Sequence, residues 1–318
     1  MVLRKDVFGV LLSVLIAGAG IGCAQLPLHP PPEPYGQLAP ARPSEKPASS
    51  SGGSAGVVQA AAPAAVLPPS VPPSASPASF PNDPSARLHV LYREAAERYA
   101  HVDSYIVRLT RREQLNGKDK PEEVLLFKFR KEPWSVYFKW LGTEGKGREV
   151  VYVRGQYENK IHTLLTAGDI PLMPAGRRFA VAPDNPFVLS SSRHPIEQAG
   201  VGTLIERFGK WLHDADTGGH SLVTLRYLGS IQRPEFGGPC EAVEQTLPPG
   251  VDQHLPRGGH RFWGFDPQTK FPALLITHDE TGHEVEYYFY DRFEFPVHLD
   301  DDDFNPDKLW SKREGTKP

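Results

Sequence analysis

Residues 124–153 alternate between apolar and polar side chains, and this pattern constrains the fold more than any other part of the chain. Phe127 and Phe129 fall on one side of the alternation, and Lys128 and Arg130 fall on the other. Successive side chains of a β-strand point to opposite faces of a sheet. The stretch therefore predicts a sheet with one aromatic face and one cationic face. The aromatic face needs a cover of helices, a second sheet or a ligand.

The same period of two recurs along the chain to about residue 295. It predicts strands close to residues 105–110, 124–130, 135–140, 149–154, 161–165, 221–229, 240–247, 262–265, 271–278 and 284–295. Helical spacing of apolar residues appears twice, after Asn82–Ser85 and within Pro195–Leu212. About eight to ten strands with two helices indicate an α+β fold built on an antiparallel sheet.

The second predicted helix carries one continuous apolar stripe, which we expect to cover the sheet rather than to contact a partner. The stripe consists of Val201, Leu204, Ile205, Phe208, Trp211 and Leu212. Before it, Thr166–Pro195 contains prolines, glycines and scattered apolar residues. Loops of this length in compact domains are usually functional or disordered. We leave two interpretations open, a lid over the aromatic face and a loop that packs on the core.

The N-terminus reads as a targeting segment followed by a tether. Residues 1–22 combine Arg4 and Lys5 with an apolar run that is typical of a signal peptide. The small residues before Cys23 resemble a bacterial lipoprotein processing site, which implies a lipid anchor at Cys23. Ala24, not Asp, follows Cys23, and by resemblance to other lipoproteins this favours the outer membrane. An ordinary secretory cleavage near Ala24 is the alternative. Residues 23–83 are rich in Pro, Ala and Ser and predict a disordered linker, which leaves 84–318 as a single folded domain.

Composition and spacing argue against several classes of function. The net charge of −3, with balanced and scattered charges, gives no case for nucleic-acid binding. Neither of the two closest histidine pairs, 254/260 and 278/283, has the spacing of a helical metal site, so no metal or cofactor is expected. No nucleotide-binding or hydrolase motif is found, and we expect a monomer that is not an enzyme.

Several motifs in order resemble one family of secreted bacterial proteins, the domain-of-unknown-function family 1571. They are Lys128-Phe129-Arg130, Pro133–Trp140, Gly147–Tyr152, Ser192–Ile196, Asp266-Pro267, Phe271-Pro272 and Tyr287–Asp291. The resemblance covers roughly residues 88–310. The family has no established activity, so it implies no catalytic residue.

A weaker resemblance, at the level of the fold, runs to the periplasmic lipoprotein carriers and their outer-membrane receptor, the LolA/LolB-like superfamily. It is based on the order of helix, strands, loop, helix and strands. It implies a strongly curved antiparallel sheet, an incomplete β-barrel closed by two helices and a long loop, with an apolar cavity for acyl chains.

The leading hypothesis is therefore a cell-envelope lipoprotein, periplasmic and membrane-anchored, that binds a lipid or acyl chain in a half-barrel. The residues predicted to line its cavity are Phe127, Phe129, Val136, Phe138, Trp140, Val223, Leu225, Val285, Tyr287 and Phe289. The alternative for these residues is a filled core without a ligand.

Two other hypotheses belong to different classes. An envelope scaffold would bind a protein or the cell wall through an outer patch, formed by Lys128, Arg130, Tyr137, Lys139 and Tyr152. A hydrolase would use Cys240 as its nucleophile.

Overall fold

The computed structural model describes residues 84–170, 173–218 and 223–311. The predicted signal peptide, the lipidation site Cys23 and the linker of residues 23–83 lie outside the described residues. None of the helices in the described part of the chain is long and apolar enough to span a membrane.

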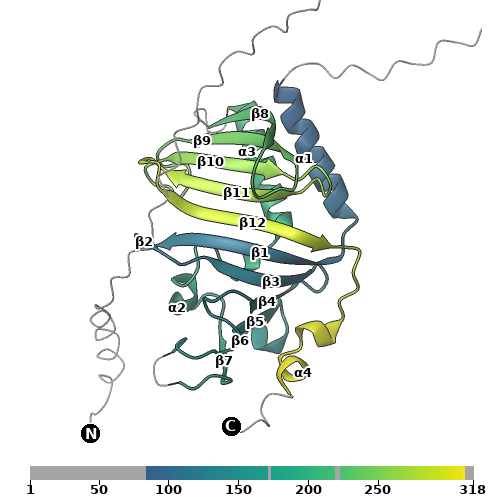
Figure 1. The fold of residues 1–318 in the computed structure, drawn as a ribbon, viewed down its shortest axis with the longest axis vertical. Helices are drawn as coiled ribbons and strands as arrows, with labels where there is room; N and C mark the ends of the chain where they lie inside the picture. The colour runs from purple at the N-terminus through teal and green to yellow at the C-terminus, as the bar shows by residue number, and fades with distance from the viewer. Residues whose placement is uncertain (1–83, 171–172, 219–222, 312–318) are drawn as a thin grey trace, which may run out of the picture. The chain divides into compact units, whose positions relative to one another are not determined.

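A single antiparallel sheet of twelve strands forms the framework of the fold (Figure 1). The strands are β1 (Ser104–Leu115), β2 (Lys118–Asp119), β3 (Glu123–Arg130), β4 (Ser135–Trp140), β5 (Glu149–Val153), β6 (Ile161–Leu164), β7 (Arg178–Val181), β8 (Thr224–Gln232), β9 (Pro239–Leu247), β10 (Gly259–Phe265), β11 (Pro272–Asp279) and β12 (Glu284–Glu294). Their order is β7-β6-β5-β4-β3-β1-β12-β11-β10-β9-β8, with β2 paired to β1 alone. The sheet is open and curved, as the resemblance to the LolA/LolB-like superfamily implies.

The first and last long strands of the domain pair in the middle of this sheet. Strand β1 pairs antiparallel with β12 on one side and with β3 on the other. The two halves of the sheet, β3–β7 and β8–β12, are therefore joined through strands that lie far apart in the sequence. Each half is a meander of neighbouring antiparallel strands, which needs only short connections.

Two long helices, α1 (Pro84–Ala100) and α3 (Val201–Thr217), cover the concave, inner face of the sheet. The predicted stripe on α3 is buried along its whole length, which confirms that it covers the sheet. The start of α3 is fixed to strand β1, because the Val201 N–H donates to the Tyr105 hydroxyl at 3.1 Å. Gly200 has a φ of 104°, and a Cβ there would lie 2.7 Å from the same hydroxyl.

The segment between β6 and α3 is more ordered than a simple loop. It contains strand β7, the short helix α2 (Pro186–Leu189) and the 3₁₀ turn η2 (Ile196–Gln198). Strand β7 extends the sheet by pairing with β6. The prediction of one long irregular stretch was therefore wrong in part, because four residues of it, Arg178–Val181, supply an edge strand.

The acidic end of the domain is folded onto the outer face of the sheet. Residues Asp301–Phe304 form the 3₁₀ turn η3, and Pro306–Trp310 form helix α4. Phe304 and Trp310 are fully buried. They pack with outward-facing apolar residues of β4–β6, so a second, smaller hydrophobic cluster lies on this side.

Candidate functional site

A pocket of about 560 Å³ lies against the inner face of the sheet, where β1, β3–β6 and β12 meet the start of α3. Its opposite wall is the described part of residues 165–200, here called the cover segment. Strand β7 and helix α2 contribute apolar residues to that wall: Phe179, Val181, Phe187 and Val188. The cover segment thus lies over the aromatic face, where the lid interpretation placed it.

One half of the pocket is apolar and is built on the aromatic face predicted from the sequence. Phe127 and Phe138, opposite each other on β3 and β4, stack with ring centroids 4.6 Å apart. Trp140 continues the row along β4, and Val150 and Ile161 add aliphatic surface from β5 and β6. Phe127 is fully buried, so the pocket surface is tightly packed around it. Phe138 is half-buried, so its ring is accessible from the pocket.

The ten residues predicted to line the cavity divide into three groups. Phe127, Phe138 and Trp140 line the pocket. Five others belong to the hydrophobic core of the inner face but do not line the pocket: Phe129, Val136, Val223, Leu225 and Val285. The last two lie in a separate cluster on the outer face, and their placement on the concave face was wrong: Tyr287 and Phe289.

The error at β12 has a physical reason. A register shift between Thr277 and His278 of β11 interrupts the pairing with β12 near Val285. After it, Tyr288 and Tyr290 join the inner-face core. Both faces of β12 are aromatic, so its sequence alone does not decide which face is buried beneath the helices.

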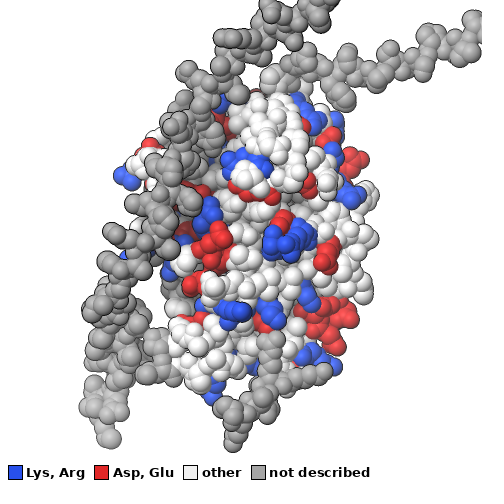
Figure 2. Space-filling model, viewed as in Figure 1, with Lys and Arg blue, Asp and Glu red and all other residues white. Residues whose placement is uncertain are grey.

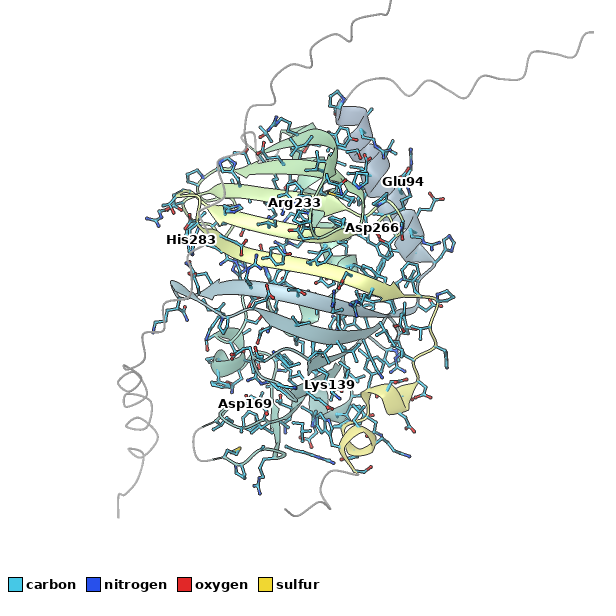
Figure 3. The ribbon with its side chains drawn as sticks, in the orientation of Figure 1. Glu94, Lys139, Asp169, Arg233, Asp266 and His283 are labelled. Atoms are coloured by element: carbon cyan, nitrogen blue, oxygen red, sulfur yellow. The ribbon has the colours of Figure 1, made fainter. Side chains whose placement is uncertain are left out.

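The other half of the pocket is charged, and two arginines organise it. Arg111 Nε donates to Glu123 Oε2 at 2.6 Å, and the indole Nε1 of Trp140 donates to Glu123 Oε1 at 2.7 Å. Arg148, the residue just before β5, donates from Nε to Asp169 Oδ2 at 3.0 Å. Figure 3 shows Asp169 at the end of the sheet that carries β7. These bidentate and bridged contacts hold the aromatic wall and the cover segment in one arrangement.

A buried polar network lies at the inner end of the pocket, centred on Glu286 of β12. Its fully buried carboxylate accepts from His194 Nε2 and from Thr277 Oγ1, the latter at 2.6 Å. Arg261 Nη2 lies 3.9 Å from Glu286 and donates to Asp252 Oδ2 at 3.0 Å. Burial alone would raise the pKa of Glu286, but the charges of His194 and Arg261 hold it well below its usual range. The side chain is therefore an ionised carboxylate inside the protein.

The cover segment is attached to the sheet through the same polar region. His194 binds Glu286, and the Arg193 backbone N–H donates to Glu113 Oε2 at 3.3 Å. Glu113 also accepts from the hydroxyl of Tyr288, whose burial raises its pKa well above the usual value. The guanidinium of Arg193 donates to the carbonyl oxygen of His254 at 2.6 Å. The residues that close the pocket are thus held by polar contacts and not only by apolar packing.

Sequence reasoning missed this polar half, although a signal for it is present. In β1 the inward positions run Tyr105, Val107, Leu109, Arg111 and Glu113, so the charged residues continue the apolar row without a break in period. Charged residues at buried positions are uncommon unless they are paired. Continuing the alternation past Leu109 would have placed both residues on the inner face.

The outer patch proposed for a scaffold is not one free surface. Tyr152 lies on the inner face and packs against Trp134, so its inclusion was wrong. Lys128 donates to Asp303 at 2.6 Å and Arg130 donates to Asp301 at 2.9 Å. These ion pairs seat the C-terminal segment on the cationic face. In Figure 2 the visible face of the described residues mixes acidic, basic and neutral areas without a continuous field of one sign.

Among the described residues, neither the thiol of Cys240 nor the histidines form a recognisable reactive site. Cys240 is fully buried, and burial raises the pKa of its thiol to about 11, which disfavours the nucleophilic thiolate. The His283 ring, which follows the turn between β11 and β12, forms its hydrogen bond with Asp119 of β2 and not with His278. No group of three or more His, Cys, Asp or Glu side chains in the described residues is placed to hold a metal ion.

Comparisons with known proteins connect the chain to one family and to a set of distant structures. The family model described as a protein of unknown function (DUF1571) matches residues 102–309. No curated protein matches the sequence. The family is the one that the sequence motifs predict.

Three solved structures illustrate the distant similarities. The Mycobacterium tuberculosis lipoprotein LppX has 13% identity and a TM-score of 0.39, and the match covers 67% of this chain and 98% of LppX. A putative outer membrane lipoprotein-sorting protein domain from Vibrio parahaemolyticus has 12% identity and a TM-score of 0.33, covering 70% and 99%. A LolA superfamily protein from Nitrosomonas europaea has 11% identity and a TM-score of 0.29, covering 69% and 98%. These likenesses assign no ligand or partner to this chain.

Proposed function

Because the chain belongs to the DUF1571 family of proteins of unknown function, we propose its function from its own pocket: it binds a hydrophobic ligand, a lipid or a lipoprotein acyl chain, in the cell envelope. The proposal assigns it no reaction. The protein holds the ligand between the curved sheet and the cover segment.

The pocket is the observation that carries the proposal. Its volume of about 560 Å³ falls within the range of roughly 300–1,000 Å³ that is common for ligand sites. The stacked rings of Phe127 and Phe138 offer a flat apolar wall to a chain. Burial of each methylene group contributes about 0.8 kcal/mol, so a long chain is retained without special polar chemistry.

The location in the envelope is proposed from the N-terminal sequence. A signal peptide over residues 1–22 would take the chain across the inner membrane. Acylation of Cys23 would anchor it, and the linker of residues 23–83 would let the pocket reach away from the membrane surface. The outer membrane is the favoured site because Ala24, not an aspartate, follows Cys23.

Mass spectrometry of solvent extracts tests the proposal directly. The full-length chain, purified under mild conditions, is expected to carry a stoichiometric lipid or acyl-chain compound. The variant Phe138→Glu places a charge on the accessible wall and is expected to lose that compound. Leu141→Glu is the matched control, because Leu141 is 45% exposed one residue after the same strand. It is expected to retain the compound.

A second variant separates loss of binding from loss of folding. Thr163 lines the pocket from β6 and is half-buried, so Thr163→Trp would fill the space without adding a charge. It is expected to fold and to exclude the ligand. Retention of the same compound by both pocket variants, or no bound compound in the wild-type chain, would refute the proposal.

A further inference from the structure

The polar half of the pocket contains a half-buried cation on its helical wall that the described residues do not pair; the other unpaired cation among the lining residues, Lys120, is exposed. Arg207 of α3 lines the pocket and is half-buried. Among the described residues its guanidinium forms neither a hydrogen bond nor an ion pair. The nearby His194 has a second unused group, because its buried Nδ1 atom has no hydrogen-bond partner.

The carboxylates near Arg207 already have other partners. Glu286 accepts from His194 and Thr277, and Asp252 accepts from Arg261 and from the His254 backbone N–H. Asp252 therefore has Arg261 as its main counter-charge, and Glu286 has His194 and then Arg261, whereas Arg207 acts on both carboxylates without a hydrogen bond or ion pair. None of the described residues gives Arg207 a direct acceptor, so a molecule in the pocket can supply one.

The chemistry of a guanidinium restricts what that molecule can be. Arginine has five N–H donors and no acceptor, and its planar fork matches a carboxylate or a phosphate. A partly buried charge that lacks a partner is unfavourable, and an anion that pairs with it removes that penalty. A cationic headgroup would meet Arg207 as a like charge, and a wholly neutral one would leave it unpaired.

We infer that the pocket selects an anionic amphiphile, with its chain against Phe127 and Phe138 and its carboxylate or phosphate on Arg207. This inference rests on the proposed function, since it names the class of ligand for the same pocket. The apolar and charged halves of the pocket thereby bind the two ends of one molecule.

Pairs of ligands that differ only in the headgroup charge test the inference. Binding of oleate and of oleyl alcohol to the delipidated full-length chain is compared by isothermal titration calorimetry. Dioleoyl phosphatidic acid and dioleoylglycerol form a second pair, which distinguishes a phosphate source from a carboxylate source. At least one acid is expected to bind about tenfold more tightly than its neutral partner, the ratio that about 1.4 kcal/mol gives.

The variant Arg207→Gln is expected to lower the ratio of the affinity for the acid to the affinity for its neutral partner from about tenfold to about one. Lys210→Gln is the matched control, because Lys210 is on the same helix, is exposed and does not line the pocket. It should keep the preference. Arg207→Lys, which retains the charge without the fork, should keep part of it.

The outcomes separate this inference from the proposed function. Equal affinity for acid and neutral ligand in the wild-type chain overturns the inference and leaves hydrophobic binding intact. An unchanged preference in Arg207→Gln also overturns it, because the anion would then be recognised elsewhere. Absence of binding for all four ligands counts against the proposed function itself. If Arg207→Gln does not fold, the wild-type comparison and Arg207→Lys still decide.

Discussion

Removing the charge of Glu286 by Glu286→Gln perturbs the centre of the buried network with almost no change in shape. The substitution deprives His194 and Arg261 of an ionised partner inside the protein. Breaking a buried charge pair from one side costs about 3–5 kcal/mol. The glutamine side chain still offers Thr277 an acceptor oxygen. We therefore expect the free energy of unfolding to fall by the lower end of this range, about 3 kcal/mol.

Thermal unfolding converts this expectation into a measurable shift. In a domain of roughly 150–250 residues, 1 kcal/mol corresponds to about 2–4 °C, so Tm should fall by about 6–12 °C near neutral pH. Glu244→Gln is the control, because Glu244 pairs with Arg226, whose side chain is 68% exposed. An exposed pair of this kind contributes at most about 1 kcal/mol.

The stability difference between wild type and Glu286→Gln should also change with pH in a definite direction. Burial raises the pKa of Glu286, but the charges of His194 and Arg261 more than offset this and hold the folded-state pKa well below the usual range. Its contribution is therefore fully present above the unfolded-state pKa of about 4.3 and is lost as the pH falls through the folded-state value. The difference between wild type and Glu286→Gln should shrink on acidification. A Tm within about 2 °C of wild type at neutral pH would contradict the reasoning.

Two further predictions concern packing and reactivity. Gly202→Ala and Gly209→Ala should each destabilise the domain by about 1–3 kcal/mol in denaturant unfolding. The reason is that each new Cβ would lie 2.4 Å from a tyrosine of α1, which is Tyr99 for Gly202→Ala. Gly237→Ala is the control: its Cβ would meet no atom within 4 Å, so it should leave the free energy of unfolding unchanged. Cys240 should fail to react with a thiol reagent at pH 8 until the domain unfolds, because its thiol is buried and its pKa is raised to about 11. Stoichiometric labelling of Cys240 itself in the folded chain, located by peptide mapping, would exclude that description of the thiol.

The alternation of apolar residues predicted much of the fold where only one face of a strand is apolar. In β3 and β4 the row through Phe127 and Phe138 is apolar and the row through Lys128 is not, so period two identified the inner face correctly. In β12 the neighbouring residues Tyr287 and Tyr288 are both aromatic, so the same rule does not distinguish the inner face from the outer face. A register shift near Val285 is a property of strand pairing, and the sequence of one strand does not display it.

The polar parts of the molecule depend on partners that are distant in the sequence. His194 and Glu286 come together only because the cover segment crosses the sheet, and neither has a local motif around it. The same applies to Arg130 and Asp301, whose pairing places the C-terminal segment on part of the predicted outer patch. Charge patterns identified both partners as polar, but only the topology of the sheet brings them into contact.

The most direct test of the account is an experimental structure of the full-length chain purified without removing its natural lipids. The account predicts continuous elongated density in the pocket, running from the rings of Phe127 and Phe138 to the guanidinium of Arg207. A pocket filled by the protein's own side chains, with the cover segment packed directly on those rings, would contradict it.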